Sequence, residues 1–153
     1  MVPKFRTVLD VLALIVTVLA FPVIAYQLWD VERIARSQNN ILLSTMFFHD
    51  PTNLGIINAI ENKKPILKTP GGEGQFTSTQ LDGYLGDLET VYDVYDEGLL
   101  SEAELCGSFS VYVQEAEADS EVQDYLKENS HYFSGLPKLF DIVDHSKNEN
   151  CRD

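Results

Sequence analysis

Hydrophobic residues form one unbroken run near the N-terminus and then recur every three or four positions along the rest of the chain. Residues 8–29 are apolar apart from a single charge, Asp10, and about 20 apolar residues are enough for a helix to cross a bilayer core. Tyr26 and Trp29 lie at the far end, where amphipathic rings prefer the membrane interface. The pattern predicts a membrane anchor over residues 1–29, with the lipid bilayer as its partner.

The same run is also compatible with a cleaved secretory signal. Lys4 and Arg6 would form its basic region and residues 11–21 its apolar core, with cleavage near Ala25. Because the apolar pattern continues beyond Ala25, we favour the uncleaved anchor.

The remaining chain divides into a stalk, a helical domain and a tail. Helical spacing persists through residues 30–50, which predicts a stalk that stops before Pro51. Residues 51–145 carry further amphipathic segments, and the Pro- and Gly-rich residues 68–76 are expected to form a mobile loop. Residues 146–153 form a polar tail.

Cap signals delimit the helices of this domain. Thr77 with Gln80 and Ser101 with Glu104 match capping boxes, and Gly98 is placed to end the intervening helix. No stretch alternates with period two for long enough to demand a strand. The prediction is an all-α protein, in which an N-terminal transmembrane helix continues into a stalk and a small helical bundle follows.

The charge is distributed unevenly. The 153 residues carry a net charge of −13, and residues 82–128 contain fourteen acids and one base, Lys127. Residues 33–68 instead hold five bases and two acids. Such acidity repels phosphate backbones, which excludes a nucleic-acid partner and favours a protein partner with a basic surface.

The candidate interaction residues follow from this acidity. They lie on the hairpin that the capping signals predict, and they combine carboxylates with tyrosines at helical spacing. Such aromatic stripes are usually core, so a tyrosine-lined groove is the bolder interpretation. The candidates are Asp93, Asp96, Glu97, Tyr84, Tyr92 and Tyr95.

Residues 93–104 also match part of an EF-hand loop. The third position is Tyr95, which offers no carboxylate or amide oxygen, and the helix-end signals explain the remaining residues without a metal. We therefore expect no cofactor and keep a degenerate calcium sensor as an alternative. Its ligands would be Asp93, Glu97, Ser101 and Glu104.

No catalytic constellation is visible in the sequence. The histidines, His49, His131 and His145, are isolated from one another, and neither Cys106 nor Cys151 stands at metal-ligand spacing from them. The two distant cysteines give no disulfide framework, and a helical Cys106 is typically a small core residue. The chain is predicted not to be an enzyme.

Several segments carry a resemblance to a known family. They are PVIAYQLWDVERIARSQNN, LDGYLGDLETVYDVYDEGLLSEAEL, FSVYV and FSGLPKLFDIV. In this plan the chain resembles bacterial single-pass, membrane-anchored small helical proteins grouped as a domain of unknown function. The resemblance implies a mostly cytoplasmic all-helical domain on one membrane helix, with no established activity and no catalytic residues.

Together these features predict a non-enzymatic, membrane-tethered interaction or regulatory module in the cell inner membrane. Bases flank the apolar run on both sides, so the positive-inside rule gives no decision, and we expect a cytoplasmic C-terminal domain. A secreted or periplasmic domain, cleaved near Ala25, is the alternative. The stalk and anchor would also allow a homo-oligomer, and an oligomerising membrane effector is a further alternative function.

Overall fold

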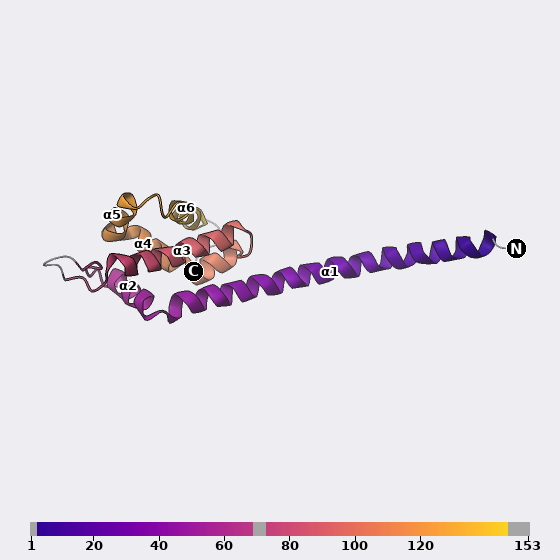
Figure 1. Cartoon of the computed structure of the whole chain (residues 1–153), viewed down its shortest axis with the longest axis horizontal. Helices are drawn as coiled ribbons and strands as arrows, with labels where there is room; N and C mark the ends of the chain where they lie inside the picture. The colour runs from indigo at the N-terminus through magenta and orange to yellow at the C-terminus, as the bar shows by residue number, and fades with distance from the viewer. Residues whose placement is uncertain (1–2, 69–72, 147–153) are drawn as a thin grey trace. The chain divides into compact units, whose positions relative to one another are not determined.

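The computed structural model describes residues 3–68 and 73–146, with side chains from Thr17 onward except those of Glu32 and Ser146. Over this described part the protein is all-helical, with six helices and no strand (Figure 1). The all-α prediction is confirmed. The helix bounds are α1 Pro3–His49, α2 Pro51–Glu61, α3 Ser78–Asp96, α4 Glu102–Ala118, α5 Ser120–Glu128 and α6 Leu136–Ser146.

The first helix, α1, runs through Pro22 without ending. The chain divides into two compact units, residues 1–36 and 37–153, so the last turns of α1 belong to the same unit as α2–α6. Among the residues whose side chains the structure describes, no helix is both long enough and apolar enough to span a membrane. The side chains of residues 8–16, the first part of the predicted anchor, are not among those described.

Local cap signals determine where the helices of the second unit begin. The Asp50 carboxylate accepts the Thr52 N–H at 2.7 Å and starts α2, and Ser101 and Glu104 form the capping box of α4. Gly98 adopts φ +72° after α3, the left-handed conformation that glycine tolerates best. These boundaries follow from neighbouring residues alone, and the sequence predicted them correctly.

The core of the second unit forms where α3, α4 and α6 pack against one another (Figure 1). Phe47, near the end of α1, is fully buried and packs its ring against those of Tyr84 at 5.5 Å and Phe109 at 6.0 Å. Asn40 accepts a hydrogen bond from the Ser108 hydroxyl at 3.2 Å. The end of α1 is therefore part of this core.

Two glutamates bind backbone N–H groups that are distant in the sequence, and we call these contacts the carboxylate clamps. The Glu89 oxygens accept the N–H groups of Gly135 at 2.7 Å and Leu136 at 2.9 Å, where α6 begins. A Cβ at Gly135 would stand 2.4 Å from the Tyr92 ring, so only glycine fits there. This clamp fixes the start of α6 on α3.

The second clamp holds the segment that follows α2. The Glu121 oxygens accept the N–H groups of Ile66 at 2.7 Å and Leu67 at 2.8 Å. Leu67 also forms an isolated bridge with Phe76, which closes the base of the loop expected over residues 68–76. Residues 69–72 of that loop lie outside the described part. Several acids thus hold the fold together.

Candidate functional site

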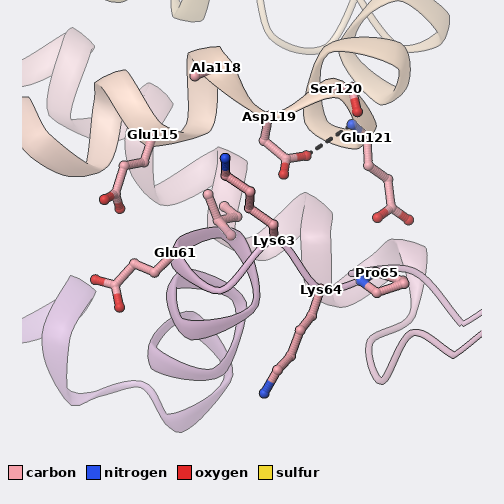
Figure 2. A pocket seen from close by; sticks show the side chains of 10 residues that line it. Glu61, Lys63, Lys64, Pro65, Glu115, Ala118, Asp119, Ser120 and Glu121 are labelled. Carbon is pink, nitrogen blue, oxygen red and sulfur yellow. Dashed lines mark hydrogen bonds between the residues drawn. The ribbon is translucent and has the colours of Figure 1, made fainter.

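A cavity of about 580 Å³ opens between the end of α2 and the junction of α4 with α5 (Figure 2). Its lining combines carboxylates, lysines and small apolar side chains. None of the described residues that line it is a histidine or a cysteine. The lining residues discussed below are Glu61, Lys63, Lys64, Glu115, Asp119 and Glu121.

Lys63 is held in an unfavourable backbone conformation at the edge of this cavity. Its N–H donates to the Ile60 carbonyl at 2.9 Å and the Lys64 N–H to the Ala59 carbonyl at 2.8 Å, the pattern of a Schellman motif. The left-handed position of that motif, φ +51°, is occupied by Lys63 instead of glycine, at a cost of about 1 kcal/mol. Figure 2 shows Lys63 extending toward Glu115 and Asp119, with Lys64 pointing away from them.

Two of the carboxylates at the cavity are already engaged with backbone. Asp119 accepts the N–H groups of Glu121 at 2.9 Å and Val122 at 3.0 Å, which caps α5. Glu121 forms the second carboxylate clamp. These two groups shape the wall of the cavity but have less hydrogen-bonding capacity left for a ligand.

Glu61 and Glu115 form the remaining acidic part of the wall. Burial raises the pKa of Glu115, and the negative charge of Glu61 raises it further. Within the described residues, the Glu115 Oε2 atom is shielded from solvent and has no hydrogen-bond partner. Such an atom costs stability unless something outside the chain completes its hydrogen bonding.

Sequence reasoning missed this site. Glu61 and Glu115 lie on different helices, and the packing of α2 against α4 brings them to one cavity. The only local signal was the Lys63–Lys64 pair at the end of α2, where one residue had to adopt the left-handed conformation that glycine would normally supply.

The predicted interaction residues separate into exposed carboxylates and packed tyrosines. Asp93, Asp96 and Glu97 are exposed at the end of α3. Tyr84 is fully buried in the core, and its burial and the nearby carboxylates raise its pKa, so its ring is not available to a partner. The prediction was wrong for Tyr84 because a residue on the apolar face of α3 packs inward.

The other two tyrosines are also held by the bundle. Tyr92 is buried, donates its hydroxyl to Asp96 at 3.4 Å and lies 5.5 Å from the Lys138 ammonium, while Tyr95 is half-buried against the core. They pack beneath the exposed residues Asp93, Asp96 and Glu97, which we call the acidic turn, and do not line a groove of the kind the sequence suggested.

Two of the four candidate calcium ligands, Ser101 and Glu104, are used for capping. Glu104 accepts hydrogen bonds from the Ser101 N–H at 2.8 Å and the Ser101 hydroxyl at 2.6 Å. Among the described residues, no group of three or more His, Cys, Asp or Glu side chains could hold a metal ion. Helix capping therefore accounts for Ser101 and Glu104, and Asp93 and Glu97 stay exposed beside them.

Cys106 is buried on α4, as the sequence predicts for a small core residue. The other cysteine of the chain, Cys151, lies outside the described part.

Comparison of the chain with protein-family models, with curated proteins and with solved structures found no match. The resemblance to membrane-anchored helical proteins of unknown function therefore stays a prediction, and the site must be interpreted from its own chemistry.

The raised pKa of Glu115 predicts a pH-dependent stability difference. Glu115 fits its partly buried site better when its carboxyl group is protonated. The stabilisation of the folded state by this proton is complete below the unfolded pKa of about 4. It is lost as the pH rises through the higher pKa of Glu115 in the folded state. Glu115→Gln should therefore unfold at higher denaturant than wild type at pH 7, and the difference should shrink to nothing at acid pH. Exposed Glu73→Gln is the control, and a Glu115→Gln variant that is less stable at pH 7 would contradict this account.

Proposed function

We propose that the protein is a non-enzymatic, membrane-tethered interaction module that recruits a partner with a basic surface. The observation that carries this proposal is the exposure of Asp93, Asp96 and Glu97 together at the end of α3. Within the described part of the chain none of the three forms an ion pair. Their charge is therefore available to a partner.

The placement of these acids favours a role in binding over a role in stability. They occupy the last turn and C-cap of α3, and that turn contains no basic residue. Negative charges at a helix C-terminus oppose the helix dipole, so each costs the fold a few tenths of a kcal/mol. The same dipole adds to the negative potential that steers a basic partner.

Tethering rests on the apolar run of residues 8–29, whose only charge is Asp10. A bilayer anchor of this kind would hold the acidic turn near the membrane and raise its local concentration toward membrane-bound partners. Helix α1, Pro3–His49, includes this run.

Neutralising the acidic turn should abolish partner capture. A photo-crosslinker at Leu99, a partly exposed neighbour of the turn, would trap the partner in native membranes as a covalent adduct. Asp93→Asn, Asp96→Asn and Glu97→Gln together should reduce the adduct about tenfold or more, because complementary charge is lost. A triple variant of the exposed residues Asp124, Glu128 and Asp141 removes equal charge as control; equal adduct in both triples would reject the proposal.

Thiol alkylation tests on which side of the membrane the helical domain lies. We expect a cytoplasmic domain, in which both cysteines of the sequence stay reduced. The full chain, alkylated under denaturing conditions without reductant, should therefore carry two adducts. Labelling that appears only after reduction would place the domain in an oxidising compartment instead.

A further inference from the structure

We propose that two copies of this protein associate through the exposed side of the last turns of α1, which we call the stalk seam. The stalk seam consists of Gln38, Ile41, Leu42 and Thr45, all of them exposed in the second unit. It shares no residue with the acidic turn, so a symmetric dimer goes beyond the recruitment of a basic partner.

The end of α1 carries apolar side chains on two opposite sides. Leu43 and Phe47 are buried in the core of the second unit. Because successive residues of a helix are rotated by about 100°, Ile41 and Thr45 lie on the other side. Ile41 and Leu42 are 65% and 66% exposed. A helix that packs on one side normally carries polar residues on the other, so the apolar stalk seam indicates a second surface that covers it.

The spacing of the stalk seam fits another helix. Gln38, Ile41 and Thr45 follow one another by three and four residues, which is the spacing of a coiled-coil contact. The same spacing continues in the sequence to Val31 and Ile34, which are exposed in the first unit. The Gln38 amide has both donors and an acceptor, so two copies of it can pair across a two-fold axis.

The charge pattern favours a second copy over a charged partner. Residues 37–48 contain no Asp, Glu, Lys or Arg, although the chain carries a net charge of −13. Two copies therefore meet at the stalk seam without opposing like charges, whereas a basic partner finds no carboxylate there. A symmetric interface needs a surface that is complementary to itself, and an uncharged apolar helix face meets that condition.

The position of the stalk seam along α1 favours a second helix over lipid. Ile41 follows Trp29, the last residue of the proposed anchor, by twelve residues in one continuous helix, or about 18 Å. A headgroup layer is only roughly 5–8 Å thick. The anchor would also hold two copies parallel and at equal height, which raises the local concentration of one stalk seam near the other. The parallel orientation rests on the proposed anchor, and the contact itself does not.

Photo-crosslinking of the full chain in native membranes identifies what covers the stalk seam. A benzophenone side chain at Thr45 should give an adduct of twice the chain mass, in which two differently tagged copies appear together. The same group at Val111, an exposed apolar position on α4, is the control and should give no such adduct. Adducts of Thr45 with lipid or with a different protein in place of the second copy, or the absence of an adduct, would overturn the proposal.

Dilution of the full chain in detergent micelles, followed by light scattering, measures the dimer dissociation constant. Ile41→Glu places a carboxylate of each copy in the stalk seam, so this constant should rise about tenfold or more. Val111→Glu adds the same charge at a side chain that is 55% exposed, and it should dimerise like wild type. Both positions are exposed, so circular dichroism should show unchanged helix content. A monomeric wild type, or equal dissociation constants for the two variants, would contradict the dimer.

The two crosslinking positions distinguish failure of the dimer from failure of the proposed function. The triple variant that neutralises the acidic turn should lose the partner adduct at Leu99 and keep the Thr45 adduct. Ile41→Glu should lose the Thr45 adduct and keep the one at Leu99. Loss of the Thr45 adduct in the triple variant alone would overturn the proposal, because the stalk seam contains no residue of the acidic turn.

Discussion

The hydrogen bonding of carboxylate oxygens to backbone N–H groups is the interaction on which the rest of this structure depends. Glu89 holds the start of α6 on α3, and Glu121 holds the segment after α2 against α5. Charge-assisted hydrogen bonds of this kind are roughly twice as strong as neutral ones. A chain with a net charge of −13 can fold in part because several of its carboxylates are stabilised by hydrogen bonds from backbone N–H groups and do not need the scarce lysines and arginines as partners.

The same interaction shapes the cavity. Asp119 and Glu121 turn their oxygens toward backbone N–H groups, and Glu61 and Glu115 complete the acidic part of the lining. Glu115 is shielded with one unpaired oxygen, and Lys63 stands in a left-handed conformation. Both features cost stability, and unfavourable features that converge on one concave site are typical of binding surfaces.

How far the sequence predicted the fold depended on the range of each interaction. The capping boxes at Thr77 and Ser101 and the left-handed Gly98 were predictable, because their partners lie within a few residues. The clamp between Glu89 and Gly135 was not, since the two residues stand far apart in the chain and only tertiary packing joins them.

The success of the predictions for the functional residues also depended on the range of each interaction. The exposed acids of the α3–α4 turn were identified from composition and caps, but Tyr84 was wrongly placed among them because its inward packing depends on Phe47 of α1. The proximity of Glu61 to Glu115 had no local signal, since it depends on which distant segments meet. Residue types therefore indicated an acidic domain with candidate interaction residues. Packing determined which carboxylates bind backbone N–H groups and which stay exposed.

The central claim, that acids hold this fold together, is tested most directly by measuring the unfolding free energy of Glu89→Ala against Asp93→Ala. Both variants remove one carboxylate from α3, but only Glu89 accepts hydrogen bonds from the start of α6. We predict that Glu89→Ala lowers the free energy by about 2–4 kcal/mol, because two N–H groups lose their acceptor, and that Asp93→Ala changes it by less than about 0.5 kcal/mol. Equal effects, or a Glu89→Ala variant as stable as wild type, would contradict the account.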